Sequence, residues 1–410
     1  MIYIRTDLTP AENAALKLPR RRTSQGVANA LLPQYTVEQA PPNWAVAAAE
    51  SVMARYPDYR EAYWKPWNYV TGYMLNGFEM LYKKTGDKKY YDYIKKYMDN
   101  FVDAGGNFTA VNPSRKNAPD RPRDNLDNIM TGSMLVAMYE HTKDERYKKA
   151  AEVFRRAFDD YPRNPDGGFW HGRGTTGQMW IDGIFMGQMF LTRYGAVIGD
   201  TQYCFDEAAK QILIYTKHEK GNTGLYYHGW TANPELREWA DKKTGLSTDV
   251  WAEGHGWYAL IISETLKLMP ADHAKRPELI ALHAKVAEGL KNFQDEKTGG
   301  WWNIVDKGGR PGNFIDPSGT AMFIYMLKRG IEMNLLDSAV YTPVVERGYA
   351  ALLSMTRINE HGLVDVWGGC DGVSIQKNYD AYASRKRMVN AKETYAGFLW
   401  AAVVMEDYNK

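Results

Sequence analysis

The chain has 410 residues, of which 44% are hydrophobic and 24% charged, enough for one large core or two smaller ones. Its net charge is only +2 and its basic residues are scattered, which argues against nucleic acid or an anionic membrane as a partner. No apolar run is long enough to span a membrane, and residues 1–18 lack the order of a signal peptide. We therefore expect a cytoplasmic protein, or a periplasmic one if a leader has been removed.

The residue types also narrow the chemistry. Cys204 and Cys370 are too far apart in sequence to suggest a disulfide framework, and no Cys/His spacing fits a zinc site. A phosphate-binding loop and a dinucleotide fingerprint are both missing, so the sequence predicts neither a metal nor an organic cofactor. Tyr and Trp are abundant, at 28 and 13 residues, and such rings stack well on sugars. The ligand that we expect is a carbohydrate.

Residues 1–40 are predicted to form an irregular arm, basic at Arg20–Arg22 and interrupted by Pro19 and Pro33. Helical periodicity fills the rest, and the alternation typical of strands is nearly absent. No linker rich in Pro, Gly or Ser divides residues 41–410, so we predict one domain there. Its twelve predicted helices are 43–56, 66–85, 88–103, 125–142, 145–160, 178–196, 201–218, 249–268, 274–294, 318–334, 337–356 and 391–407.

Short loops that start with glycine and carry aromatic residues recur between the helices. Each loop joins the second helix of one pair to the first helix of the next, as in a repeat of helical hairpins. Five connectors join six hairpins, which predicts an all-α (α/α)6 barrel with an inner and an outer ring of helices. An open superhelix is the alternative, but no polar capping repeats are evident. The five connectors are GNF (Gly106–Phe108), GGFWH (Gly167–His171), GLYYH (Gly224–His228), GGWWN (Gly299–Asn303) and GLVDVW (Gly362–Trp367).

The most informative residue is Asp182, within GQMWIDGIFMGQMF (Gly177–Phe190). Apolar residues cover almost the whole circumference of this predicted helix, which indicates that it is buried. A carboxylate there is costly unless it is hydrogen-bonded, ion-paired or protonated, and such an environment suits an acid–base catalyst. The structural alternative is that Asp182 only braces the helix, through the backbone or Trp180.

In a closed barrel, the N-terminal ends of the inner helices and the loops before them line one funnel. Asp127 lies within the fourth predicted helix, where function and bracing are equally plausible. His171 and His228 occupy matching places in two repeated loops, which favours a functional role for both. Two carboxylates in a sugar-binding funnel predict glycosidase chemistry. The remaining candidates for substrate binding are Arg173, Trp180, Trp230, Glu253, His255 and Trp257.

Several polar residues also have a structural explanation. Asp124 and Asp316 stand where a helix N-cap is expected, and we predict capping for both. Glu253 and His255 share a glycine-containing helix start, which either lets a ligand approach the backbone or serves capping and packing. The tryptophans can belong to the core, although we expect at least one to stack on a sugar.

Taken together, these segments resemble the unsaturated glucuronyl and rhamnogalacturonyl hydrolases, the α/α-barrel enzymes of glycoside hydrolase families 88 and 105, more closely the latter. The resemblance implies a six-hairpin barrel that acts on lyase-generated oligosaccharides with a Δ4,5-unsaturated uronic acid at the non-reducing end. It covers about half of the chain. The matching stretches are NLDNIMTGSML, GGFWHGRGTTGQMWIDGIFMGQMFLTRYG, GLYYHGW, WAEGHGWYALIISETL, TGGWWNIVD and PSGTAMFIYML.

The resemblance also implies roles for individual residues. Asp182 matches the catalytic acid/base, which protonates C4 of the vinyl ether before water adds at C5 and the hemiketal opens to expel the remaining sugar. Asp127 matches a second active-site aspartate. The active-site histidines and aromatic subsite residues are matched by His171, His228, Trp180 and Trp257.

One departure from the family concerns the segment WAEGHGW (Trp251–Trp257). Glu253 and His255 stand where the family often has an arginine, which helps to bind substrate, and an asparagine. The group that binds the uronate carboxylate is therefore open, with Arg173 and His255 as candidates. Glu253 would repel an anion unless it is protonated or paired.

Two other functions remain open from the residues alone. A sugar epimerase or isomerase on the same barrel would use His171 and His228 as a facing pair that moves a proton on and off carbon. A non-catalytic carbohydrate-binding protein would bind sugar without turnover, although it gains little from a buried acid such as Asp182.

Overall fold

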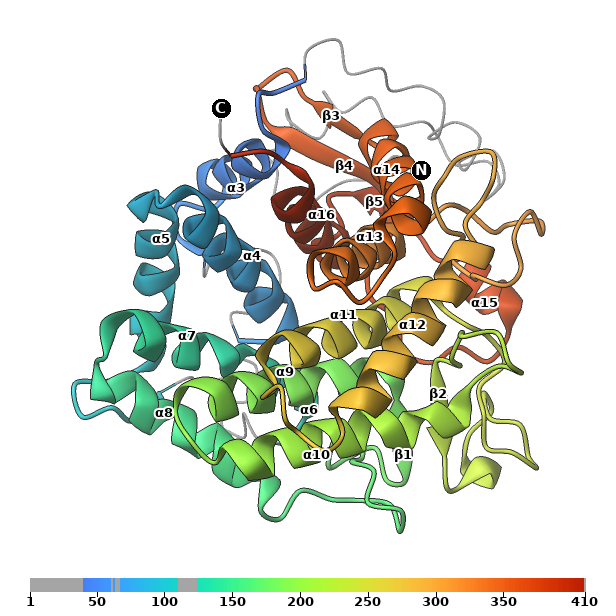
Figure 1. Cartoon of the computed structure of the whole chain (residues 1–410), viewed down its shortest axis with the longest axis horizontal. Helices are drawn as coiled ribbons and strands as arrows, with labels where there is room; N and C mark the ends of the chain where they lie inside the picture. The colour runs from blue at the N-terminus through green and yellow to red at the C-terminus, as the bar shows by residue number, and fades with distance from the viewer. Residues whose placement is uncertain (1–39, 60–61, 63–66, 110–123, 409–410) are drawn as a thin grey trace.

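The computed structural model describes residues 40–59, 62, 67–109 and 124–408, which form two concentric rings of helices (Figure 1). All twelve predicted helices are present, and the (α/α)6 barrel is confirmed. The predicted arm lies outside the described residues except for residue 40. The one-domain organisation stays a prediction, although a single buried apolar cluster runs from Trp44 to Val404.

The inner ring consists of six helical segments that alternate along the chain with the outer ones. Its members are α4 (Tyr69–Thr85), α6 (Leu126–Thr131) with α7 (Ser133–Thr142), α9 (Ile181–Val197), α11 (Ala252–Leu268), α13 (Pro317–Glu332) and α16 (Lys392–Met405). The outer ring consists of α3 (Trp44–Arg55), α5 (Lys88–Met98), α8 (Glu145–Arg155), α10 (Thr201–Ile214), α12 (Arg276–Asn292) and α14 (Ser338–Ser354).

The two ends of the described chain complete the barrel. Inner helices contact one another in the order α4, α6, α9, α11, α13 and α16, and α16 returns to α4. The outer helix α3 packs on α16, where the Trp44 backbone N–H donates to Glu406 Oε2 at 3.0 Å and the Tyr395 hydroxyl donates to the Ala48 carbonyl at 3.1 Å. The sixth hairpin therefore joins the first and last helices, which excludes an open superhelix.

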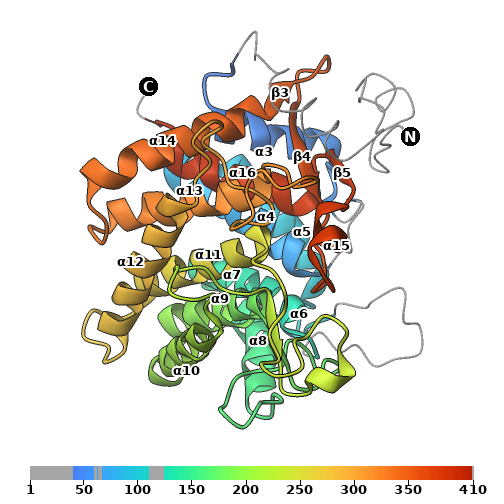
Figure 2. The ribbon, with the colours of Figure 1, turned by 90° about the vertical axis from the view of Figure 1, so that its right-hand side faces the viewer.

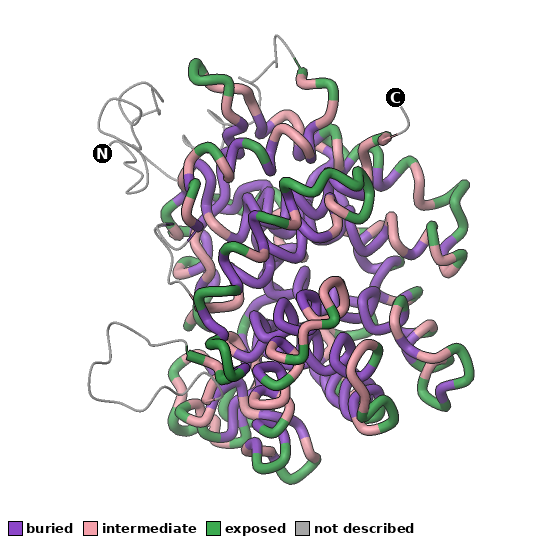
Figure 3. The backbone as a smooth tube through the Cα atoms, turned by 90° about the vertical axis from the view of Figure 1, so that its left-hand side faces the viewer, coloured by how far each residue is buried: buried purple, intermediate pink, exposed green. Residues whose placement is uncertain are grey.

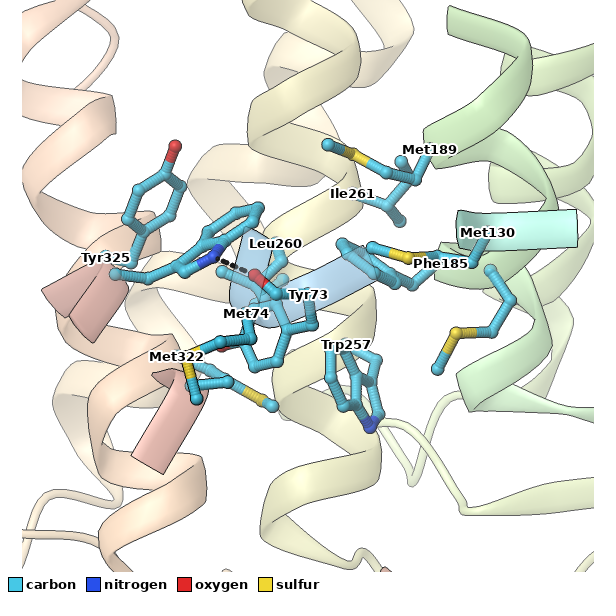
Figure 4. Packing of buried hydrophobic residues seen from close by; sticks show 14 of the residues in the cluster. Tyr73, Met74, Met130, Phe185, Met189, Trp257, Leu260, Ile261, Met322 and Tyr325 are labelled. Carbon is cyan, nitrogen blue, oxygen red and sulfur yellow. Dashed lines mark hydrogen bonds between the residues drawn. The ribbon is translucent and has the colours of Figure 1, made fainter. Parts of the chain in front are cut away.

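Burial explains why the inner helices carry so few charges. Every residue of α9 from Ile181 to Gly195 is buried, whereas outer helices such as α5 bury one face only. Figure 3 shows the buried backbone gathered inside the molecule. Aromatic rings fill the centre of the barrel, where Tyr73 packs 4.6 Å from Trp257 and 4.9 Å from Trp400 (Figure 4). Such pairs stabilise a core beyond the area that they bury.

The predicted helix 125–142 is interrupted at Gly132. The Gly132 N–H donates to the Ile129 carbonyl at 2.9 Å, three residues back, so the backbone tightens locally between α6 and α7. A side chain at Gly132 would also meet Phe154 and Phe190, at 3.0 and 3.1 Å. Other short 3₁₀ turns lie at the ends of helices or in loops: η2 (Asp99–Phe101), η3 (Arg156–Phe158), η4 (Tyr215–His218) and η5 (Pro234–Leu236).

Short strands are the main addition to the predicted elements. β1 (Gln178–Trp180) pairs antiparallel with β2 (Gly229–Thr231), and Trp180 lies opposite Gly229. β3 (Thr356–Ile358), β4 (Val364–Cys370) and β5 (Arg387–Val389) form a second antiparallel sheet. This sheet and the short helix α15 (Tyr379–Ala383) gather at one side of the helices (Figure 2). Three-residue strands are too short for alternation to reveal them.

The prediction of helix caps is right for one aspartate and wrong for the other. Asp316 caps α13 by accepting from the backbone N–H groups of Ser318 and Gly319. Asp124 does not cap α6, because the next residue, Asn125, accepts from the Asp127 N–H instead.

Within the described ranges, none of the helices is long and apolar enough to cross a membrane.

Candidate active site at the N-terminal ends of the inner helices

Inner helices begin at the same end of the barrel. In Figure 4, Trp257 lies below Leu260 and Met322 lies below Tyr325, so α11 and α13 run in one direction. Their first turns are in contact, since a side chain at Gly319 would lie 2.6 Å from Ala252. Four inner helices carry an acid in the first turn, where the helix dipole favours negative charge: Asp127, Asp182, Glu253 and Glu393.

Asp182 lies at the start of α9 and is hydrogen-bonded to His228. The two short strands explain their approach, because β1 leads into α9, β2 follows His228, and the Ile181 N–H donates to the His228 carbonyl at 2.9 Å. The Asp182 Oδ2 atom lies 3.1 Å from His228 Nε2. On its other side, His228 Nδ1 lies 2.6 Å from the Tyr382 hydroxyl.

The hydrogen bonds around Tyr382 define the tautomer of His228. The Tyr382 hydroxyl accepts from the Gln376 N–H at 3.1 Å, and both Tyr382 and His228 are fully buried. All groups are satisfied when the hydroxyl donates to His228 Nδ1 and His228 Nε2–H donates to Asp182. The opposite arrangement would leave the hydroxyl proton without an acceptor, which is costly in a buried site.

Asp127 and His171 form a second pair beside Trp180. Asp127 Oδ1 lies 3.5 Å from His171 Nε2, and the His171 ring stacks on the Trp180 indole at a centroid distance of 4.4 Å. Trp180 also meets His228 edge-on at 6.3 Å, so the two acid–histidine pairs are neighbours. Asp127 remains about a quarter exposed, which leaves it accessible to a ligand.

The pKa of His171 is raised although the ring is buried. Burial alone lowers it, but the carboxylates of Asp127 and Asp182 raise it by more. The backbone of Gly183 makes room for this ring, since a side chain there would lie 2.9 Å from His171 Nδ1. Asp127 and Asp182 therefore favour protonation of the His171 ring, which stacks on Trp180.

A further group of acids surrounds Glu253 at the starts of α11, α13 and α16. Glu253 is buried, and burial together with the charges of Glu393 and Asp316 raises its pKa well above the ordinary value. Burial also raises the pKa of Asp316 to about 6. Glu393 accepts from the Tyr69 hydroxyl at 2.6 Å. Lys392 completes this group, with its Nζ 3.0 Å from Glu393 and 3.3 Å from Asp371.

Tyr69 and Trp257 connect this group to the first two pairs. The Tyr69 ring meets Trp257 edge-on at 5.9 Å. Burial raises the pKa of Tyr69, and the charges of Glu393, Glu253 and Asp127 add to the effect. Trp257 is buried against Tyr73 and Phe185, and its indole nitrogen points away from them in Figure 4. The three groups therefore belong to one end of the inner ring.

Three predicted binding residues are not brought into these groups by the contacts described. Arg173 pairs with Asp160 of its own loop at 2.6 Å and with Asp124, just before α6, at 3.6 Å. Trp230 lies opposite Met179 in the ribbon, so it lies on the other face from Trp180 and stacks on His218 instead. Alternation along a strand explains the difference.

His255 is the third of these residues, and it belongs to the core. It is fully buried between Tyr226 and Phe323, and burial lowers its pKa to about 3, so the ring is neutral. It therefore cannot supply the positive charge for a uronate carboxylate. The preceding Gly254 serves close helix packing rather than ligand approach, because a side chain there would lie 3.0 Å from Ile181.

Tyr382, Lys392 and Glu393 were missed by the sequence analysis. Glu393 carries the same signal as Asp182, an acid in the first turn of an otherwise apolar helix, and this signal could have found it. Tyr382 has no such signal. Among the described residues, no group of three or more His, Cys, Asp or Glu side chains is arranged to hold a metal ion.

Comparison with known proteins places this geometry in a family. The sequence profile of Glycosyl Hydrolase Family 88 matches residues 44–409. The chain belongs to glycosyl hydrolase family 88. This family 88 protein is 24% identical to the unsaturated rhamnogalacturonyl hydrolase YesR of Bacillus subtilis (strain 168). The matched region of 330 residues covers 77% of this chain and 83% of that protein.

Solved structures are also similar to the chain. A glycoside hydrolase of family 105 from C. acetobutylicum ATCC 824 is 27% identical with a TM-score of 0.80, over 88% of this family 88 chain and 99% of that one. The unsaturated glucuronyl hydrolase of Bacillus sp. GL1, responsible for the degradation of glycosaminoglycan, is 15% identical with a TM-score of 0.63, over 88% and 96% of the two chains. The second likeness shows the fold alone. The resemblance to families 88 and 105 is therefore confirmed, and these families comprise unsaturated uronyl hydrolases.

Proposed function

We propose that the chain releases a Δ4,5-unsaturated uronic acid from the non-reducing end of lyase-generated oligosaccharides. The observation that carries this proposal is the hydrogen-bonded series Asp182–His228–Tyr382 beside the partly exposed Asp127. It supplies one acid held by a hydrogen bond from a buried partner, next to a second acid that a substrate can reach. The family membership and the likeness to YesR support the same reaction class.

The geometry suits a single residue that alternates as acid and base. When His228 Nε2–H donates to Asp182 Oδ2, the other oxygen of a protonated Asp182 is free to deliver its proton to C4 of the vinyl ether. The carboxylate that remains is stabilised by the same N–H donor. It can then accept a proton from the water that adds at C5, which restores the acid. The hemiketal that forms opens and expels the remaining sugar.

Asp127, His171 and Trp180 would hold the substrate in this scheme. His171, whose protonation Asp127 favours, would provide a donor for a sugar substituent. Trp180 is half-buried and offers its indole at the same place. Asp127 would thus position substrate and influence the charge around Asp182, whereas Asp182 touches the reacting carbons. Trp257 and Glu253 would line the neighbouring part of the site.

The epimerase alternative receives less support from the contacts. That reaction needs two histidines free to exchange protons with a sugar carbon, but His228 is fully buried and engaged on both ring nitrogens. The non-catalytic alternative leaves the Asp182–His228–Tyr382 series without a purpose.

The proposal is tested with a panel of unsaturated disaccharides made by polysaccharide lyases. Hydrolysis predicts loss of the double-bond ultraviolet absorbance and products whose summed mass exceeds the substrate by one water. An epimerase would leave the mass unchanged, and a binding protein would leave the substrate intact. Turnover of a uronide without a double bond, but of none with one, would contradict the proposal.

A further inference from the structure

The short helix α15 carries Tyr382 to His228, yet it packs outside the main core. A helix of five residues is not stable on its own, so contacts with the rest of the chain must hold it in place. Ile375, just before α15, lies against Gly229, but apolar contact does not fix a direction. The apolar cluster that contains α15 is separate from the main core and consists of Trp251, Ile304, Val373, Tyr379, Tyr382 and Ala383.

Tyr379, the first residue of α15, makes directional contacts with the loop 304–313, which precedes α13. Its hydroxyl donates to the carbonyls of Arg310 and Pro311, at 3.1 and 3.0 Å. The Arg310 guanidinium lies over the Tyr379 ring, 3.7 Å from the centroid, which is a favourable position for a cation on an aromatic face. The buried Tyr379 therefore anchors α15 to this loop at both its ring and its hydroxyl.

The anchor lies next to the contact that matters for His228. Tyr379 and Tyr382 are three residues apart, so their side chains leave α15 on the same side. The hydrogen bond from the Gln376 N–H to the Tyr382 hydroxyl is internal to this segment and would move with it. The 2.6 Å contact between the Tyr382 hydroxyl and His228 Nδ1 joins the segment to another part of the chain, so it depends on where α15 is held.

The loop 304–313 is also connected to the backbone of His228. Lys307 of this loop pairs with the fully buried Asp249, and its Nζ atom lies 5.5 Å from the centre of the Tyr379 ring. The Asp249 carbonyl in turn accepts from the His228 N–H at 3.1 Å. The contacts thus form a closed circle of five residues: His228, Asp249, Lys307, Tyr379 and Tyr382. One loop thereby sets the positions of both the histidine and its hydroxyl partner.

We propose that Tyr379 is a positioning residue for the reaction. By holding α15 against the loop 304–313, it keeps the Tyr382 hydroxyl on His228 Nδ1 and so directs the Nε2 proton of His228 at Asp182. The inference rests on the proposed function, because Tyr379 acts on the reacting groups only through Tyr382 and His228. It assigns Tyr379 no contact with substrate.

The experiment places two substitutions of Tyr379 in two backgrounds, the natural protein and Tyr382→Phe. Tyr379→Phe removes only the hydroxyl, and it should fold because the acceptor carbonyls belong to exposed residues that water can reach. Tyr379→Leu removes the ring as well. The control is Tyr93→Phe, which removes a hydroxyl that donates to the Tyr56 carbonyl at 2.6 Å in the outer ring.

On an unsaturated disaccharide we expect Tyr379→Phe to lower kcat about fivefold and Tyr379→Leu to lower it further, with KM nearly unchanged. In the Tyr382→Phe background the same substitutions should lower kcat no further, because the contact that they act through is already lost. A merely structural role predicts the same loss in both backgrounds. Tyr93→Phe should leave kcat unaltered. Equal losses in the two backgrounds, or no loss in either folded variant of Tyr379, would overturn the inference.

A measurement without substrate separates failure of this inference from failure of the proposed function. Nitrogen-15 NMR of protein labelled at histidine reports the ring nitrogens of His228, whose signals are assigned by their loss in His228→Gln. We expect the Nδ1 signal of a hydrogen-bonded acceptor in the natural protein and in Tyr93→Phe, and a shift toward a nitrogen without that bond in Tyr379→Leu. If no unsaturated uronide is hydrolysed but this pattern is seen, the reaction is wrong and the positioning role stands. If hydrolysis is seen and the His228 signals are the same in Tyr379→Leu as in the natural protein, the positioning role is wrong.

Discussion

His228 holds Asp182 through its Nε2 atom, which lies 3.1 Å from Asp182 Oδ2, while its Nδ1 atom lies 2.6 Å from the Tyr382 hydroxyl. Asp182 lies at the start of α9, His228 directly before β2 and Tyr382 in α15, and the barrel brings them together with His228 and Tyr382 fully buried. The proton on His228 is thereby directed at the carboxyl group that we assign as the catalyst.

Removing the Tyr382 hydroxyl should weaken the hydrogen bond by which His228 holds Asp182. In Tyr382→Phe, His228 Nδ1 loses its donor and the Gln376 N–H loses its acceptor. We expect kcat to fall about tenfold and stability to fall by about 1–2 kcal/mol. The control is Tyr258→Phe, which removes a buried hydroxyl that donates to the Ile212 carbonyl. Equal losses of kcat in both variants would assign Tyr382 a structural role only.

The raised pKa of His171 predicts a pH dependence of stability. The folded protein binds this proton more tightly than the unfolded chain does, so the stabilisation is complete below the ordinary pKa of 6.5 and is lost as pH rises through the raised value. The free-energy advantage of the natural protein over His171→Gln should therefore shrink as pH rises from 6.5 through the raised pKa. Urea unfolding at several pH values measures it, and an advantage that grows with pH would contradict the assignment.

The raised pKa of Glu253 also predicts that the stability of the folded protein falls as pH rises, here because burial disfavours the charged carboxylate. Its pKa is raised above the ordinary 4.5 by burial and by Glu393, so the folded state prefers the neutral acid. The natural protein loses this stabilisation as pH rises from 4.5 through the raised value. Glu253→Gln removes the ionisation, and its stability relative to the natural protein should increase over that range. A difference that is constant with pH would show that Glu253 ionises normally.

Lys392 should stabilise the fold by compensating the charge of the neighbouring Glu393. Lys392→Met leaves Glu393 buried without its cation, and we expect a loss of about 3 kcal/mol in the free energy of unfolding. The double variant Lys392→Met/Glu393→Gln should recover most of that loss, because the amide needs no counter-charge. Thermal unfolding of the two variants compares them, and equal instability would mean that Lys392 acts through packing.

The sequence predicted the barrel because burial leaves a clear mark on the inner helices. A helix such as α9, buried from Ile181 to Gly195, is apolar over most of its circumference, and the single acid in its first turn is conspicuous for that reason. The contact of α3 with α16 could not be predicted, since Trp44 and Glu406 lie at opposite ends of the sequence. Closure had to be inferred from the number of repeats.

Other parts of the candidate site depend on details that periodicity does not carry. Trp180 and Trp230 look alike in sequence, and only the register of β1 with β2 places them on opposite faces. Tyr382 lies in a five-residue helix and reaches His228 across 154 positions, so no local pattern connects them. His255 resembled a binding residue, but it packs against Phe323 in the core.

The most direct test of the account is the activity of purified Asp182→Asn on an unsaturated disaccharide, followed by loss of ultraviolet absorbance, beside Asp127→Asn. Asn keeps the volume of Asp182 and can accept from His228, so the thermal unfolding temperature should change little. It can neither give a proton to C4 nor take one from water, and each role is worth roughly 10²–10⁴-fold. We predict a loss of kcat at or beyond the upper end of that range for Asp182→Asn, and a smaller loss for Asp127→Asn. Substantial activity in Asp182→Asn together with an inactive Asp127→Asn would contradict the assignment.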